Sequence, residues 1–210
     1  MDLVTTPVSD RRQRLSVVVA GFGQNFILTT VTTFILVYLL QYAHISVGGM
    51  AVVTGILTAT KIFDAVSDPI VGSIIDRTRT RWGKMRPFIL FAAAPVALLT
   101  TLLFAVPDIA ESGKLVFFGV VFFLWGIAYT ACDVPYWGLI GSAFPDPAVR
   151  TSVISQVRAY GGISLGIATL GMPWFAQLLS GGTTTATGWS FAIGMPSVAM
   201  PSEMPPYART

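Results

Sequence analysis

Three charged side chains follow one another at helical spacing inside an apolar stretch of the sequence. They are Lys61, Asp64 and Asp68, at positions i, i+3 and i+7. In a helix this spacing places all three on one face. Two carboxylates four residues apart repel each other when both are ionised, and a proton, a bound cation or a neighbouring ammonium group relieves that repulsion. The spacing therefore predicts a cation site, with the alternative that Lys61 neutralises one carboxylate and the cluster only holds helices together.

A second group of chemically capable residues surrounds Asp133. Tyr129 and Thr130 lie four and three positions before it, and Trp137 lies four after it. A helix would bring this phenol, hydroxyl and indole to one side of the carboxylate. A carboxylate accepts hydrogen bonds from vicinal hydroxyls, and an aromatic face packs against the C–H side of a sugar ring, so the group predicts a sugar site. The alternative is local repair of the backbone, because Pro135 frees a carbonyl inside the same helix.

One further charge, Arg158, lies in a later apolar stretch. Its planar guanidinium could bind Asp133 or substrate hydroxyls, or it could extend to the polar edge of a membrane. His44 lies in a polar turn and is assigned no role, and the single cysteine, Cys132, allows neither a disulfide framework nor a thiolate metal site. The sequence shows no Ser-His pair, metal-ligand cluster or phosphate-binding glycine loop, so we do not expect an enzyme.

The elements that must position these residues are strongly apolar. Of the 210 residues, 53% are hydrophobic and 11% are charged, about half the charged share of an ordinary soluble domain. A membrane-spanning helix needs about 20 mainly apolar residues, and five stretches meet that length. They lie at about residues 15–42, 47–75, 87–106, 115–144 and 152–180. The expected fold class is all-α, a polytopic membrane helix bundle with five complete transmembrane helices.

The connections between these stretches are short, which favours antiparallel neighbours, and they carry much of the charge. Three arginines precede residue 15, five lysines and arginines lie within residues 76–86, and Arg150 follows on the same expected side, against Lys114 alone on the other. Cytoplasmic loops of membrane proteins are enriched in Lys and Arg. We therefore expect a multi-pass protein of the inner (plasma) membrane, with residues 1–14 as a cytoplasmic amino-terminal tail and with no nucleic-acid partner.

The sequence after residue 180 breaks this pattern. Residues 181–210 are rich in Gly, Thr, Pro and Met, and the apolar run that starts with Trp189 to Ile193 is stopped by prolines from Pro196 onward. That run is too short to span a membrane. We expect an incomplete sixth helix and an atypical tail that is truncated or frameshifted.

Three sequence motifs resemble those of a known family. The run from Lys61 to Gly72, KIFDAVSDPIVG, and the following DRTRTRWGK from Asp76 to Lys84 are similar to the second helix and the next loop of the melibiose-carrier family. The run from Trp125 to Trp137, WGIAYTACDVPYW, is similar to the fourth helix of that family. Over residues 15–180 the chain thus resembles the glycoside-pentoside-hexuronide:cation symporters of the major facilitator superfamily, and it corresponds to their amino-terminal half.

The resemblance implies a cation-coupled sugar symporter that uses sodium or a proton, with no cofactor and no metal beyond the coupling cation. The residues it implies for the cation are Asp64, Ser67, Asp68 and Thr130. The residues it implies for the sugar are Asn25, Tyr129, Asp133, Trp137 and Arg158. Asn25 stands where melibiose carriers have an acidic residue, and Ser67 stands where sodium-using relatives tend to carry asparagine. Galactoside specificity and the identity of the ion therefore stay open.

The resemblance also implies partners: a glycoside or other small sugar, the lipid bilayer and a missing carboxy-terminal half. Carriers of this architecture rock two half-bundles about a midplane site, so five helices leave one wall of the cavity absent. Two alternatives therefore stay open. The chain could be a non-transporting fragment, or a small membrane scaffold subunit that binds partners without dependence on sugar or cation.

Overall fold

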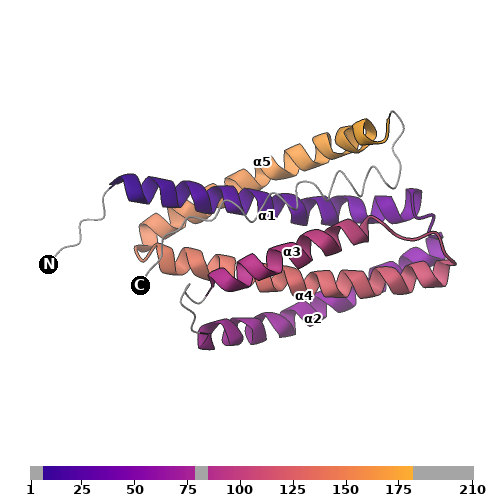
Figure 1. Cartoon of the computed structure of the whole chain (residues 1–210), viewed down its shortest axis with the longest axis horizontal. Coiled ribbons are helices and arrows are strands. Elements are labelled where there is room, and N and C mark those ends of the chain that lie inside the picture. Colours follow the sequence, from indigo (N-terminus) through magenta and orange to yellow (C-terminus); the bar gives the residue numbers. More distant parts are fainter. Residues whose placement is uncertain (1–6, 79–84, 182–210) are drawn as a thin grey trace.

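The computed structural model describes residues 7–78 and 85–181 of the chain. Within these ranges every regular element is a helix, and five helices follow one another (Figure 1). They are α1 (Pro7–Gln41), α2 (Val47–Arg77), α3 (Arg86–Leu103), α4 (Glu111–Ala143) and α5 (Pro147–Leu179). The expected incomplete sixth helix and the tail from residue 182 onward lie outside the described residues.

Among the described residues, four helices are long and apolar enough to cross a membrane. They are α2, α4, α5 and the part of α1 from Arg11 onward, each with 31 or 33 residues. At 1.5 Å per residue, 33 residues extend about 50 Å, well beyond a hydrocarbon core of about 30 Å. The apolar part of α3 is shorter, from Pro87 to Leu103. The predicted all-α bundle of membrane type is therefore confirmed, whereas complete spans are supported for four of the five predicted helices.

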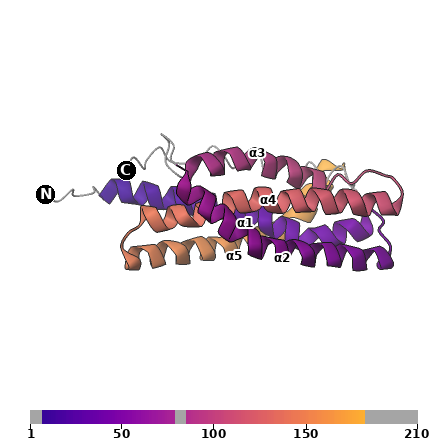
Figure 2. The same cartoon turned by 90° about the horizontal axis from the view of Figure 1, so that it is seen from below.

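The chain runs back and forth along the long axis of the bundle, so α1, α3 and α5 point one way and α2 and α4 the other (Figure 1). The main contacts join α3 with α4, α1 with α5, and α2 with α4. In both views α3 lies alongside α4 (Figure 2). The pairs α1 with α5 and α2 with α4 are parallel, and only α3 with α4 among these three is antiparallel. Short connections make consecutive helices antiparallel, but two of the three main pairs join helices that are not consecutive.

Glycines on α4 allow its close parallel packing with α2. A Cβ built on Gly119 would lie 3.3 Å from Ile56 Cδ1. A Cβ built on Gly126 would lie 3.2 Å from Thr60 Cγ2 and 3.4 Å from Asp64 Oδ1. Small residues let helices approach closely in lipid, where van der Waals contact drives association. These contacts bring Asp64 of α2 against α4.

Two apolar clusters fill the bundle, one toward each end. In α1 their buried members are separated by residues 19–26, and in α4 by residues 126–135. These two segments contain Gln24 and Asp133, two of the polar residues within the helices. We call the layer that they form the polar band. The fold thus places polar side chains between two apolar cores, near the middle of the bundle.

Gly21 lies at a close junction of α1, α4 and α5. A Cβ built there would collide with the Tyr136 hydroxyl, which donates to the Val17 carbonyl at 3.0 Å, and would lie 2.8 Å from Val157 Cγ1. We expect Gly21→Ala to displace Tyr136 and to lower the free energy of unfolding by about 1–3 kcal/mol, because the extra methyl group overfills a packed site. A lower midpoint of thermal unfolding in detergent would report this loss.

Gly166→Ala in α5 is the matched control for this prediction, because a Cβ built there meets no atom within 4 Å. Alanine is also the better helix former, so this control should unfold at the parent temperature or slightly above it. Equal midpoints for the two variants would contradict the close junction at Gly21.

Candidate functional site

Asp133 lies half-buried in the polar band, and side chains from two helices hold its carboxylate. Its Oδ1 accepts a hydrogen bond from Gln24 Nε2 of α1 and another from Trp137 Nε1 of α4 at 3.1 Å. Gln24 is itself buried, with 6% of its surface exposed. An ionised carboxylate only accepts hydrogen bonds, so it cannot satisfy the carbonyl that Pro135 frees. Among the described residues, the partners of this carboxylate are side-chain donors, and a binding role for Asp133 stays a prediction.

Helix α5 adds a guanidinium group to the same place. Arg158 Cζ lies 5.8 Å from the centroid of the Trp137 ring, within the range of a cation–π contact. The indole of Trp137 thus joins Asp133 on one side and Arg158 on the other. Three helices together present an acceptor, a set of donors and an aromatic ring, which are the groups that bind a polyhydroxylated ring.

Tyr129 joins this group through its neighbours. Its ring stacks on Trp125 with centroids 5.1 Å apart, and its side chain lies near the Gln24 amide. Trp125 is buried and donates from Nε1 to Thr100 Oγ1 of α3 at 2.8 Å. Tyr129 is therefore held from α3 on one side and directed to the polar band on the other.

Asn25 is placed differently from the other predicted sugar residues. Its Nδ2 donates to the Gly21 carbonyl of its own helix at 2.8 Å, and its side chain faces Gly161 of α5, where a Cβ would lie 3.2 Å away. The α1 side chain that bonds to Asp133 is the neighbouring Gln24. Sequence reasoning did not assign Gln24 a role. The available signal was a hydrogen-bonding amide in an apolar helix, one position from the residue that was chosen.

The charged group on α2 contains an ion pair and a buried oxygen. Lys61 Nζ lies 3.0 Å from Asp64 Oδ2, and the two side chains are 68% and 18% exposed. Asp64 Oδ1 is buried and has no hydrogen-bond partner among the described residues. Ser67 Oγ donates to the Asp64 backbone carbonyl at 3.3 Å, while Asp68 is exposed. A buried acceptor without a donor is costly, and a cation or a proton would satisfy it.

Thr130 lies on α4 beside this group. The parallel packing of α2 and α4 continues beyond Gly126, because a Cβ built on Gly72 would lie 3.9 Å from Val134 Cγ1. Thr130 is buried and falls between these two contacts along α4, at the height of Asp68 on α2. Of the four residues expected to hold a cation, Asp64 and Thr130 thus lie along the contact between α2 and α4, whereas Asp68 is exposed.

The α2 group and the Asp133 group are close enough to interact electrostatically. Asp68 and Lys61 are the charged side chains of α2 that lie near the Asp133 carboxylate. Charges interact strongly where water is sparse, because the effective dielectric constant is low. A positive charge bound beside Asp68 would thus offset part of the repulsion between Asp68 and Asp133.

A family model described as MFS/sugar transport protein, where MFS denotes the major facilitator superfamily, matches residues 16–201. The chain belongs to this family. The resemblance to glycoside-pentoside-hexuronide symporters is thereby confirmed. Members of the MFS sugar transport family are transporters rather than enzymes, as the sequence predicted. Family membership and the four apolar helices together make the chain a multi-pass membrane protein.

Curated relatives extend this likeness along most of the chain. It is similar to the isoprimeverose transporter of Lactiplantibacillus pentosus, with 31% identity over 90% of this chain and 39% of the relative. An uncharacterized symporter of Bacillus subtilis is 29% identical over 83% of this chain and 37% of the relative. The lactose permease of Lactobacillus helveticus is 30% identical over 54% of this chain and 18% of the relative. The chain therefore spans less than two-fifths of the length of these relatives.

Proposed function

We propose that the chain supplies the amino-terminal helices of a cation-coupled sugar symporter of the inner membrane, with its amino terminus in the cytoplasm. The observation that carries this proposal is the Asp133 carboxylate at the meeting point of α1 and α4, hydrogen-bonded by Gln24 and Trp137. Arg158 of α5 lies over the same indole. Two relatives named for sugars, an isoprimeverose transporter and a lactose permease, support a sugar as the substrate.

The proposed recognition of the sugar rests on complementary hydrogen bonding. A sugar hydroxyl both donates and accepts, so it pairs with the Asp133 carboxylate as acceptor and with the Arg158 guanidinium as donor. Trp137 lies between the two and offers aromatic surface to the C–H face of the sugar ring. Tyr129 adds a hydroxyl from the preceding turn of α4, and Asn25 borders the group from α1.

The proposed coupling rests on the charge of the α2 group. Carboxylate and hydroxyl oxygens suit a hard cation such as sodium, and the carboxylates also accept a proton. A positive charge at Asp64 and Asp68, with help from Ser67 and Thr130, would reduce the repulsion on Asp133 and so raise sugar affinity. Thermodynamic linkage then requires the sugar to raise cation affinity by the same factor.

Alternating access in this architecture needs a second half-bundle that rocks against the first around the midplane site. The relatives are more than twice as long as the matched part of the chain, which supports a carboxy-terminal half as the partner. We therefore expect transport from a pair of halves and not from these helices alone.

Uptake of radiolabelled isoprimeverose and lactose into cells that lack their own carriers tests this function. The chain is expressed alone, and beside the carboxy-terminal half of the Lactiplantibacillus pentosus relative, with and without sodium. We expect cation-dependent uptake by the pair, and its loss in Asp68→Ala. If membrane insertion is confirmed but neither the chain alone nor the pair takes up sugar, with or without sodium, the chain would instead be a non-transporting fragment or a scaffold subunit.

Gln24 provides a further prediction about the sugar site. Gln24→Leu removes a donor to Asp133, and a hydrogen bond to a charged group contributes about 1.5–3 kcal/mol. We expect the KM for sugar uptake by the pair to rise at least about tenfold, because the carboxylate loses its fixed orientation. Gln41→Leu, at the exposed end of the same helix, is the matched control and should keep the parent KM. An unchanged KM in Gln24→Leu would remove Gln24 from the site.

A further inference from the structure

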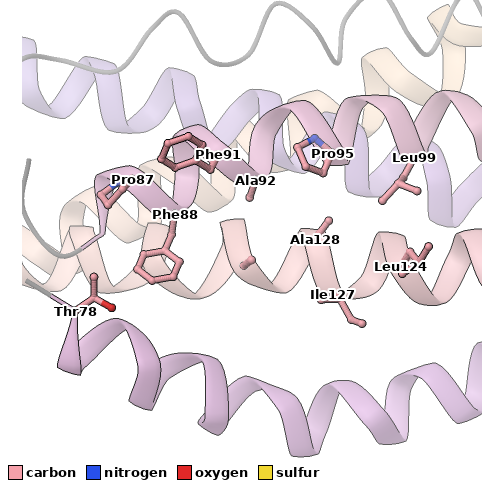
Figure 3. A pocket seen from close by; sticks show the side chains of 11 residues that line it. Thr78, Pro87, Phe88, Phe91, Ala92, Pro95, Leu99, Leu124, Ile127 and Ala128 are labelled. Atoms are coloured by element: carbon pink, nitrogen blue, oxygen red, sulfur yellow. The ribbon is translucent and has the colours of Figure 1, made fainter. Parts of the chain in front are cut away.

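Away from the candidate sugar and cation sites, α3 and α4 enclose an apolar groove of about 600 Å³ (Figure 3). It extends from Thr78 and Pro87 at one end to Leu99 and Leu124 at the other. Of its eleven lining residues, all except Thr78 are apolar. A sugar would lose its water there without gaining hydrogen bonds, so the groove suits a hydrocarbon ligand.

The groove has the length and the opening that an acyl chain needs. Its α3 wall runs from Pro87 to Leu99, which at 1.5 Å per residue is about 18 Å, close to the depth of one leaflet of the hydrocarbon core at about 15 Å. Ala92 of α3 and Ala128 of α4 both project into the space between the two helices, and their small side chains leave that space open (Figure 3). Phe91 is 71% exposed, so the groove opens toward the surroundings of the bundle.

The Thr78 end of the groove lies at the basic end of the bundle. Arg77 directly precedes Thr78, is the last residue of α2 and is exposed. Arg77 therefore offers an exposed positive charge beside this end of the groove. Basic residues close to a bilayer attract anionic headgroups, each strengthening the binding by about five-fold.

We propose that this groove binds one acyl chain of an anionic phospholipid whose headgroup lies beside Arg77. The lipid would occupy the space between α3 and α4 and would couple their packing to the composition of the membrane. Its site shares no residue with the sugar and cation groups. The lipid proposal can therefore be tested, and can fail, independently of the proposed transport function.

Photolabelling of the full chain tests this proposal. The chain is placed in phosphatidylcholine nanodiscs that contain a small share of phosphatidylglycerol with a photoactivatable acyl chain, and labelled peptides are mapped by mass spectrometry. We expect the label to concentrate on the groove walls of α3 and α4. Ala128→Leu should reduce this labelling several-fold by filling the groove, and Arg77→Gln should lower it about five-fold by removing one headgroup contact.

Matched variants decide the outcome. Ala159→Leu, on an exposed face of α5, and Arg11→Gln, an exposed arginine of α1, should leave labelling of the groove unchanged. If Ala128→Leu does not fold, Ala92→Leu fills the groove from the opposite wall. Labelling spread evenly over all helices, or groove labelling that survives the folded groove variant, would overturn the proposal. Equal labelling by a matched phosphatidylcholine probe would overturn the assignment of an anionic headgroup.

Discussion

Asp133→Asn is expected to abolish measurable sugar uptake by the chain and its partner half, with a fall of about a hundredfold or more. Asparagine keeps the size of the side chain and one acceptor oxygen, but it loses the negative charge. The Gln24 and Trp137 donors would then face a weaker acceptor. Sugar hydroxyls would lose the charge-assisted hydrogen bonds that we assign to this carboxylate.

Initial rates of radiolabelled isoprimeverose uptake would measure this effect, with membrane amounts of each variant matched by immunoblotting. Asp108→Asn is the matched control, because that carboxylate is fully exposed and lies in the connection between α3 and α4, away from the polar band. Lys114 is buried but also donates to the Ala43 carbonyl at 2.9 Å, and an amide oxygen at position 108 still accepts from it, so uptake should stay near the parent rate. Normal uptake by Asp133→Asn would place the sugar elsewhere.

The helices of this chain were predictable because the membrane limits the choice of structure. Every backbone polar group in hydrocarbon must bond within its own element, so an apolar run of sufficient length becomes a helix. The ends were less predictable. Helix α1 begins at Pro7 and continues through Arg11, Arg12 and Arg14, ahead of the predicted start at residue 15. Hydropathy reports where hydrocarbon begins, whereas helical hydrogen bonding continues into water.

The helix partners could not be predicted from the connections. Short connections place consecutive helices near each other, yet α1 packs mainly on α5 and α2 on α4. The sequence contains Gly126 and Gly161, but it does not show which side chains these glycines face. In the structure Gly126 faces Thr60 and Asp64, and Gly161 faces Asn25. Partner choice depends on how surfaces fit in three dimensions, which one-dimensional spacing does not contain.

The same distinction explains the candidate site. Contacts within one helix could be predicted from spacing alone. Trp137 donates to Asp133 four positions before it, and Lys61 pairs with Asp64 three positions after it. Contacts between helices could not be predicted from spacing, since Gln24 is separated from Asp133 by 109 positions in the sequence. The assigned roles of these residues remain predictions, and the sharpest test concerns the α2 pair.

Asp64→Asn and Lys61→Gln are expected to change cation dependence in opposite directions. Asp64 offers a buried, unpartnered Oδ1, while Lys61 holds its Oδ2 at 3.0 Å. Asp64→Asn removes the charge that attracts the cation, so stimulation of uptake by sodium, or by low pH without sodium, should be lost. Lys61→Gln removes a competing positive charge. Because Lys61 is largely exposed, the gain in cation affinity should be modest, and the half-saturating cation concentration should fall about five-fold.

Lys61→Arg is the matched control, since it keeps the positive charge and should keep the parent cation dependence. The competing explanation is that the Lys61–Asp64 pair only holds helices together. That explanation predicts that Lys61→Gln lowers the midpoint of thermal unfolding and leaves the half-saturating concentration unchanged. The two explanations therefore differ in which quantity moves, and measuring both in one set of variants decides whether Asp64 binds the coupling cation or merely accepts an ammonium group.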